Sequence, residues 1–318
     1  MSSVVPAQLP AIPATVVGGY LGAGKTTLVN QMLRQANGLR LAVLVNDFGD
    51  LAIDADLIES QEDNVINIAG GCVCCSFGSD LIAALKDVRN FDPRPDHLLI
   101  EASGVSLPGS IAESVTLVAD FEMDSVIVLA DAETVRQRSR ETYFADTISR
   151  QLSSADLILL NKCDLPTEDE LAETEAWLKG AFQNAVLVPT CRSELPLSLL
   201  IDNGATKRQT SCKTAVSDIQ FNGHPTYVSA VIEFDKGVDP ASLAQRLAAE
   251  DTGLLRSKGH VVGADKEVYT VQTVGRKSEV RKSRPGVDNI GRMVVITNRL
   301  DMEPASLAAE LGGRSPAE

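Results

Sequence analysis

The sequence predicts an α/β fold, a doubly wound and mainly parallel sheet followed by a small α+β domain. Two observations predict it. Short apolar runs alternate with amphipathic stretches through the first part of the chain, and this pattern changes after residue 225. The runs are rich in Val, Leu and Ile, as expected for strands buried on both faces of a parallel sheet. Alternation of such strands with helices is typical of a doubly wound domain.

The elements follow from this pattern in chain order. In the first part we expect strands at residues 14–17, 41–45, 65–68, 97–100, 125–129, 157–160 and 185–188. Helices are expected between them at 25–35, 79–88, 107–118, 133–153 and 168–182. Residues 201–225 are polar and hold no good strand or helix. Beyond them we expect strands at 226–234, 261–263, 267–274 and 293–297, and helices at 239–250 and 303–311. The predicted domains are therefore residues 1–205 and 226–318, joined by a linker at 206–225.

The overall charge and composition exclude several classes of protein. A net charge of -14 argues against a protein that coats nucleic acid or an anionic membrane, since both require a positive field. The first 14 residues have no basic residue before an apolar core and contain three prolines, so they make a poor signal peptide. No apolar run approaches the roughly 20 residues of a membrane span. We therefore expect a cytoplasmic protein without nucleic-acid or membrane partners.

A phosphate-binding loop is predicted at residues 19–26, whose sequence Gly-Tyr-Leu-Gly-Ala-Gly-Lys-Thr fits the Walker A pattern in full. An apolar strand precedes the loop and a helix follows it, which is the context that the pattern requires. Backbone N–H groups and the helix N-terminus would surround the phosphates. Lys25 would contact the β- and γ-phosphates, and the Thr26 hydroxyl would ligate Mg²⁺. The residues expected to hold the nucleotide here are Gly19, Gly22, Ala23, Gly24, Lys25, Thr26 and Thr27.

An acidic residue at the end of a second apolar strand is the next element that such a site needs. Glu101 follows Leu-Leu-Ile at the end of the strand predicted at 97–100, and Gly104 comes three residues later. Glu101 would hold the Mg²⁺ shell or the attacking water, and the Gly104 N–H would face the γ-phosphate. The alternative is that Glu101 caps the next helix. Together with Lys25, these two residues are the predicted catalytic groups.

The base is predicted to be guanine because Asn161, Lys162 and Asp164 follow the strand at 157–160. A carboxylate only accepts hydrogen bonds, and guanine offers two donors on one edge where adenine offers an acceptor. Asp164 would therefore favour GTP over ATP. Lys162 would lie along the base and Asn161 would tie the loop together. A chance match of this motif in an ATP-dependent kinase is the alternative.

Three of the six cysteines crowd into residues 72–75, after Gly70 and Gly71. A disulfide framework would space the cysteines out, so this crowding indicates metal or redox chemistry in a reducing compartment. The two glycines allow a turn that gathers Cys72, Cys74 and Cys75 around one ion. Three thiolates suit Zn²⁺ and other thiophilic ions and leave a fourth position open. A redox-active pair and plain buried cysteines are the alternatives.

These motifs, in this order, resemble the CobW-type metallochaperone GTPases, relatives of UreG and HypB. The hallmark of that family is a Gly-Cys-x-Cys-Cys motif, which residues 71–75 match completely. Residues 46–50, Asn-Asp-Phe-Gly-Asp, resemble the family's switch I, and residues 255–259, Leu-Arg-Ser-Lys-Gly, resemble a signature of its C-terminal domain. Relatives often have glutamates where this chain has Asp47 and Asp50. The resemblance suggests Asp47 as a further Mg²⁺ ligand, beside Thr26 and Glu101.

The resemblance implies a mechanism and a set of partners. GTP and Mg²⁺ would order switch I, and hydrolysis would change the affinity of the cysteine site for its metal, Zn²⁺ or Co²⁺. The ion would pass to an unidentified client metalloprotein. A second copy of the chain is a further candidate partner, in a homodimer that depends on the nucleotide or on the metal. The alternative is an assembly or activator module for one metalloenzyme, with little metal transfer of its own. The three histidines are well separated, which argues against metal storage.

Overall fold

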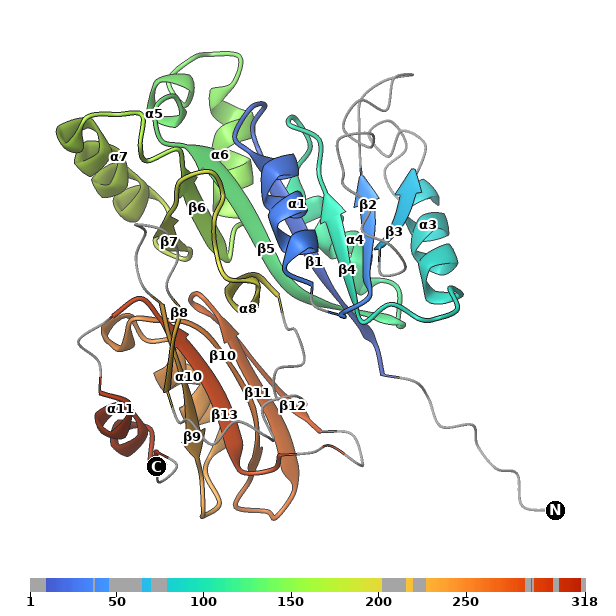
Figure 1. The fold of residues 1–318 in the computed structure, drawn as a ribbon, viewed down its shortest axis with the longest axis vertical. Helices are drawn as coiled ribbons and strands as arrows, with labels where there is room; N and C mark the ends of the chain where they lie inside the picture. Colours follow the sequence, from blue (N-terminus) through green and yellow to red (C-terminus); the bar gives the residue numbers. More distant parts are fainter. Residues whose placement is uncertain are drawn as a thin grey trace.

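The computed structural model describes residues 10–36, 38–45, 65–69, 79–201, 216–219, 227–283, 287, 289–299 and 303–315. It shows an upper parallel sheet with helices on both faces and a lower antiparallel sheet (Figure 1). The predicted fold class is confirmed. None of the helices in the described part of the chain combines the length and apolar character that crossing a membrane requires.

Seven described strands form the upper sheet in the order β3-β2-β4-β1-β5-β6-β7, and every neighbouring pair is parallel. Their bounds are β1 Ile12–Gly19, β2 Leu41–Val45, β3 Val65–Ala69, β4 His97–Glu101, β5 Phe121–Asp131, β6 Leu157–Asn161 and β7 Val186–Pro189. Each of the seven strands expected in this part of the chain is present. Because the strands are parallel, the residues that follow them meet at one edge of the sheet.

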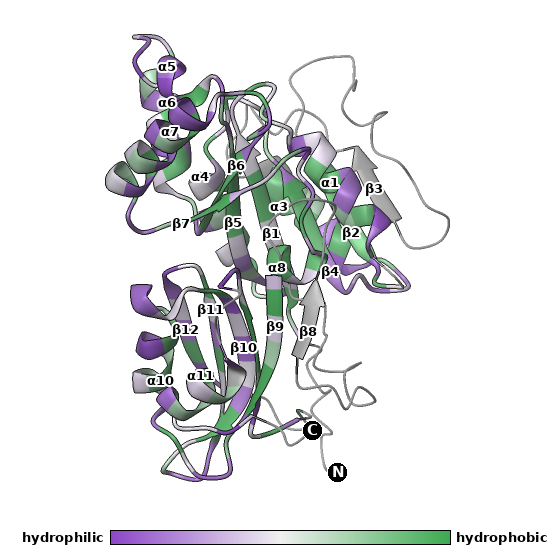
Figure 2. Cartoon of the chain, turned by 60° about the vertical axis from the view of Figure 1, so that its left-hand side comes forward, coloured by the Kyte–Doolittle hydropathy of each residue, from purple (hydrophilic) through white to green (hydrophobic). Residues whose placement is uncertain are grey.

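Helices cover both faces of this sheet. Their bounds are α1 Lys25–Arg34, α3 Ser79–Arg89, α4 Pro108–Thr116, α5 Val135–Arg138, α6 Ala145–Ser153, α7 Glu168–Ala181 and α8 Leu197–Leu200. Neighbouring residues of β1 show how the faces are shared. Val17 packs with the apolar side of α1, and Val16 packs on the opposite face in the cluster that α3 and α4 complete. In Figure 2 the hydrophobic colour accordingly follows the central strands.

The lower sheet has six described strands, in the order β12-β11-β10-β13-β9-β8, and every neighbouring pair is antiparallel. Their bounds are β8 Val216–Ile219, β9 Tyr227–Glu233, β10 Leu254–Val262, β11 Val268–Val274, β12 Lys277–Lys282 and β13 Arg292–Thr297. Helices α10 Pro240–Leu247 and α11 Pro304–Glu310, with the short 3₁₀ helix Glu250–Thr252, complete the domain. Its own core lies between this sheet and the two helices.

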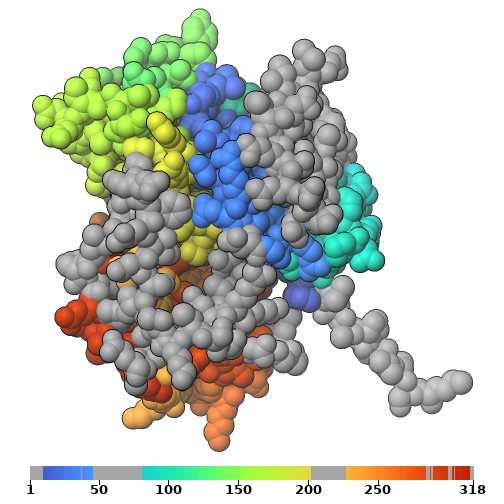
Figure 3. All heavy atoms as spheres, viewed as in Figure 1, coloured from blue at the N-terminus to red at the C-terminus, as the bar shows by residue number. Residues whose placement is uncertain are grey.

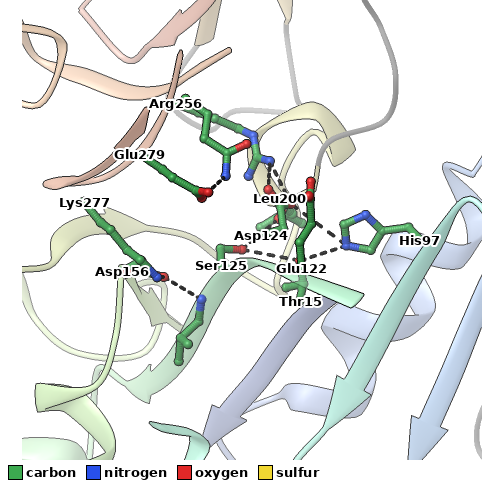
Figure 4. A network of polar contacts seen from close by, with 12 residues as sticks. Thr15, His97, Glu122, Asp124, Ser125, Asp156, Leu200, Arg256, Lys277 and Glu279 are labelled. Carbon is green, nitrogen blue, oxygen red and sulfur yellow. Dashed lines mark hydrogen bonds and ion pairs between the residues drawn. The ribbon is translucent and has the colours of Figure 1, made fainter. Parts of the chain in front are cut away.

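The lower sheet contacts the amino ends of strands in the upper sheet (Figure 4). Arg256 on β10 donates twice to Asp124 on β5, at 2.5 and 2.7 Å, and both side chains are buried. Arg281 on β12 also pairs with Glu122 on β5. Apolar contacts continue this interface, because Tyr227 and Val274 belong to the same core cluster as Leu200 on α8. The two sheets therefore share one apolar core beside an ionic contact.

Four expectations about the elements were wrong. The helix expected at 133–153 is two helices, α5 and α6. Phe144 lies between them and packs against Tyr20, with the rings tilted by 55° and their centroids 5.4 Å apart. No strand was expected in the stretch 201–225, but it contains β8. This strand lies inside the predicted linker 206–225 and pairs with β9.

In the C-terminal part, the strand expected at 261–263 is much longer, because β10 already begins at Leu254. The polar residues of β10 hid it, since the burial of Arg256 depends on its partner Asp124. Strand β12 was missed because its sequence, Lys-Ser-Glu-Val-Arg-Lys, is almost wholly polar. It pairs with β11 at the edge of the described sheet, where charged side chains are common.

Candidate nucleotide-binding site

The loop between β1 and α1 has the geometry of a phosphate-binding loop. Gly24 immediately precedes α1 in the left-handed region, with φ of 106°. A Cβ at this position would lie 2.4 Å from Asn161 Nδ2, so the loop requires glycine here for two reasons. Lys25 is the first residue of α1, and only 9% of it is exposed. The N-terminus of α1 is therefore directed at the carboxyl edge of the sheet, where an anion would bind.

Thr26 and Glu101 meet at this edge. The Thr26 hydroxyl donates to Glu101 Oε1 at 2.8 Å, and Glu101 is 2% exposed. The backbone after Glu101 stays attached to β1, since Ala102 N donates to Val17 O at 2.8 Å. A hydroxyl and a carboxylate are oxygen donors of the kind that Mg²⁺ prefers. These two side chains fit the magnesium site predicted from the sequence.

Gly104 lies against the phosphate loop. A Cβ at Gly104 would come within 2.9 Å of the backbone nitrogen of Leu21 and still closer to the Leu21 side chain. The turn that contains Gly104 therefore approaches the loop as closely as only a glycine allows. Glu101 and Gly104 both lie beside the loop that carries Lys25.

Asn161 connects three loops at the end of β6. Its Nδ2 donates to Ala23 O at 2.9 Å and to Ser193 Oγ at 3.1 Å, and its Oδ1 accepts from Ser193 N at 2.9 Å. Ser193 Oγ also donates to Gly24 O at 3.3 Å. The phosphate loop is thus tied to the loops that follow β6 and β7. On the face shown in Figure 3, the α1 region (blue) and the segment near residue 195 (yellow) lie side by side.

Lys162 is held in a defined position by Asp131 at the end of β5. Its φ is 63°, and its Nζ lies 2.7 Å from Asp131 Oδ2 at the end of that strand. Lys162, Asp164 and residues of the phosphate loop line an open pocket of about 470 Å³. The remaining lining residues are Gly22, Gly24, Thr27, Gln31, Asn161, Leu165, Arg192 and Glu194. This volume is within the range of small-ligand sites, roughly 300–1,000 Å³.

Two cysteines lie beside this pocket. Cys163 follows Lys162, and its Sγ lies 3.0 Å from Leu160 O. Burial raises the pKa of the Cys163 thiol to about 11. The pKa of Cys191 is also raised, mainly by burial, and the negative charge of Asp164 adds to the effect. Both thiols are therefore neutral near pH 7, which argues against a role for either as a thiolate nucleophile.

Sequence reasoning missed Asp131 and Ser193. Asp131 ends β5, and Ser193 follows β7, so both come after strands that were expected at nearly these positions. The carboxyl ends of parallel strands meet at one edge, and this rule could have placed both residues beside the phosphate loop. Arg192 and Ser193 also have positive φ values of 51° and 56°, a rare conformation that is concentrated at binding sites.

The predicted metal ligands Cys72, Cys74, Cys75 and Asp47 lie outside the described residues, as does Asp50. Among the residues that the structure does describe, no group of three or more His, Cys, Asp or Glu could hold a metal ion.

Comparisons with known proteins agree with this geometry. A model of the CobW/HypB/UreG nucleotide-binding domain matches residues 13–188, and a model of the cobalamin synthesis protein cobW C-terminal domain matches residues 227–313. The zinc chaperone CobW of Pseudomonas aeruginosa is 30% identical over 355 residues, which covers 95% of this chain and 91% of that protein.

Two further relatives are similar along most of their length. The zinc chaperone CobW of a Sinorhizobium species is 26% identical over 340 residues, covering 94% of this chain and 96% of that protein. The zinc chaperone YjiA of Escherichia coli is 30% identical over 263 residues, covering 78% and 81%. With the phosphate loop and the pocket beside Asp164, these matches identify the chain as a member of the CobW/HypB/UreG family of P-loop GTPases.

Proposed function

We propose that this protein is a GTP-dependent metallochaperone that binds a thiophilic metal ion through Cys72, Cys74 and Cys75 and delivers it to a client metalloprotein. One observation carries the proposal. The Cys-x-Cys-Cys segment connects the carboxyl end of β3 to the start of α3, and β3 ends at the sheet edge where the nucleotide site lies. The metal ion is the cargo of the protein, and GTP is its substrate.

The sheet topology explains why the two sites would communicate. Strand β2 lies between β3 and β4, and all three are parallel. The chain leaves β3 at Ala69 on the same edge at which β4 presents Glu101, and it enters α3 at Ser79. In the sequence, the expected switch I at residues 46–50 directly follows β2, the strand between β3 and β4. A change in the nucleotide can therefore act on the segments next to the cysteines, provided that the two states differ in their affinity for the metal.

The residues of the nucleotide site have separate tasks in this proposal. Lys25 and the N-terminus of α1 would bind the phosphates, and the backbone N–H of Gly104 would contact the terminal phosphate. Thr26 and Glu101 would hold Mg²⁺, which neutralises charge that develops on the phosphates during hydrolysis. Glu101 would also orient water. Asp164 would accept from the guanine N1–H and 2-amino groups, since a carboxylate matches two donors.

Zinc is the metal that the relatives favour, since the three proteins named above are zinc chaperones. Three thiolates bind Co²⁺ as well, so the ligand set alone does not choose between the two ions. The competing function is that of a nucleotide-dependent assembly module for one metalloenzyme, and the following experiment separates the two.

Zinc stoichiometry with and without a non-hydrolysable GTP analogue tests the metal site. The unsubstituted protein should bind zinc, and the variant with Cys72, Cys74 and Cys75 replaced by Ser should lose this binding, because it loses every proposed thiolate. The matched control replaces the other three cysteines, Cys163, Cys191 and Cys212, and should keep the zinc. Normal zinc binding by the first variant would refute the proposed site.

Metal transfer is tested with the zinc-loaded protein. Zinc passed to a competing chelator should rise when GTP is hydrolysed, and it should not rise with the analogue. A protein that hydrolyses GTP but releases no zinc in this assay would be the assembly module instead.

A further inference from the structure

Gln151 on α6 is a buried polar residue that the proposed mechanism does not yet use. It is 1% exposed, yet it carries an amide that must find partners away from water. Its Nε2 donates to Gly104 O at 3.1 Å and to Ser106 O at 2.8 Å. Both acceptors are backbone carbonyls of the turn after Glu101. Because carbonyl oxygens only accept hydrogen bonds, the nitrogen of the Gln151 amide must face them.

The turn itself is compact. Ser106 N donates to Ser103 O at 3.1 Å, and the two hydroxyl oxygens of Ser103 and Ser106 lie 2.7 Å apart. Gly104 and Val105 form its tip. A peptide unit is planar and trans, so its C=O and N–H point in opposite directions. The bond from Ser106 to the Ser103 carbonyl therefore orients the N–H of Gly104, and Gln151 fixes the next peptide unit through the Gly104 carbonyl.

The turn is enclosed between two rigid surfaces. On one side Gly104 lies against Leu21 of the phosphate loop, with no room for a Cβ. On the other side is α6, whose residues Ile148 and Leu152 are 2% exposed and belong to the core. Helix α6 also touches the helix that follows the turn, since a Cβ at Gly109 would lie 2.9 Å from Ser154 Cβ. The Gln151 side chain thus connects a fixed helix to a turn that lies against the phosphate loop.

We propose that Gln151 is a positioning residue for GTP hydrolysis, holding the turn at 103–106 so that the Gly104 N–H faces the terminal phosphate. This inference rests on the proposed function, because it needs Gly104 to act on GTP. Gln151 itself touches no substrate in this account. Its effect reaches the terminal phosphate of GTP through the Gly104 N–H, and GDP lacks that phosphate. Loss of the Gln151 amide should therefore slow hydrolysis and leave GDP binding unchanged.

Two substitutions test the role of Gln151. Gln151→Met keeps the length of the side chain and removes both donors, and Gln151→Asn keeps the amide but shortens its reach by one methylene. Gln151→Met should lower kcat for GTP by about 10- to 100-fold, the loss typical of a reacting group displaced by about 1 Å. Gln151→Asn should lie between Gln151→Met and the unsubstituted protein. The Kd for a fluorescent GDP should stay within about twofold in both.

The matched control is Gln137→Met, at an exposed glutamine on α5. It should leave kcat and GDP affinity unchanged. If kcat and GDP affinity fall together in the Gln151 variants, the residue merely supports the fold, and the proposal is overturned. Unchanged kcat in both variants also overturns it. If Gln151→Met does not fold, the kcat and GDP affinity of Gln151→Asn decide in the same way. Failure of the proposed function differs from these results, since it would be seen in the unsubstituted protein, as GTP turnover without zinc release or as no GTP turnover.

Discussion

Single side chains hold the nucleotide site together by acting on more than one loop. Asn161 makes three hydrogen bonds to two other loops, and Ser193 bonds to both Asn161 and Gly24. Asp164 follows in the same turn and lines the pocket. The position of Asp164, the proposed base-reading carboxylate, therefore depends on a hydrogen-bond network that is sensitive to the loss of any one group.

Replacing Asp164 by Asn should reverse the base preference. The amide offers donors where guanine also offers donors, so GDP affinity should fall by about 100-fold or more. Xanthine carries a carbonyl in place of the 2-amino group, so affinity for its nucleotide should rise. Competition binding with GDP and xanthosine diphosphate measures both. Asp169→Asn, at an exposed residue in the first turn of α7, is the control and should change neither affinity. An unaltered preference for guanine in Asp164→Asn would place base recognition elsewhere.

Strand β1 and helix α4 approach one another unusually closely. A Cβ at Gly18 would lie 2.1 Å from Pro108 Cγ, at the first residue of α4. The proline ring is rigid and cannot move aside alone, so the glycine sets the distance between the strand that carries the phosphate loop and the helix after Glu101. Packing of two elements, as much as phosphate binding, explains why glycine stands at this position.

Two glycine substitutions should therefore have opposite effects on stability. Gly18→Ala should destabilise the protein by about 1–3 kcal/mol, the usual effect of inserting a methyl group into a full core. Gly180→Ala should stabilise it by about 0.5–1 kcal/mol, because alanine restricts the unfolded chain. Gly180 lies in α7, and no described atom is within 4 Å of a Cβ built there. Denaturant unfolding of both variants measures the two changes in unfolding free energy. An unchanged unfolding free energy for Gly18→Ala would show that α4 can shift to accommodate the methyl group.

At the scale of the whole molecule, the lower sheet is attached where the strands of the GTPase sheet begin. Asp124 receives Arg256, and Asp156, just before β6, lies 3.6 Å from Lys277. Within the upper sheet, His97 at the start of β4 lies beside this contact, with its Nε2 4.0 Å from Asp124 Oδ2 and 2.9 Å from Thr15 Oγ1 on β1 (Figure 4). Strands β5 and β6 carry Asp131 and Asn161 at their other ends. The C-terminal domain thus contacts the ends of these strands that lie opposite the candidate nucleotide site.

Breaking the buried ion pair should weaken the whole fold. Arg256→Met removes one partner and leaves the Asp124 carboxylate buried, which should cost about 3–5 kcal/mol of unfolding free energy. Adding Asp124→Asn to this variant should recover part of the loss, because the uncompensated charge disappears. Denaturant unfolding of the two single variants and the double variant gives the coupling. Arg246→Met breaks a solvent-exposed pair with Asp251 and should have a much smaller effect. Equal effects of the two arginine substitutions would contradict this account.

Much of the upper sheet could be predicted because its signals are local. Strands buried on both faces are continuous apolar runs, and all seven were expected within a few residues of their bounds. The edge strand β12 and the strand β10 gave no such signal. Some of their charged residues have partners far along the chain, since Arg256 on β10 pairs with Asp124 and Arg281 on β12 pairs with Glu122. Between α5 and α6, Phe144 likewise packs against Tyr20, which lies more than a hundred residues earlier.

The same division applies to function. The amino-acid sequence by itself determined the phosphate loop, Glu101, the guanine motif at Asn161 to Asp164 and the cysteine motif, because each consists of residues close together in the chain. Only the tertiary structure decided that Ser193 supports Asn161, that Asp131 holds Lys162 and that Gln151 reaches the turn at Gly104. These contacts join residues at least 30 positions apart. The strand-end rule could have placed Asp131 and Ser193 at this edge of the sheet, but only folding decides which side chains there contact one another.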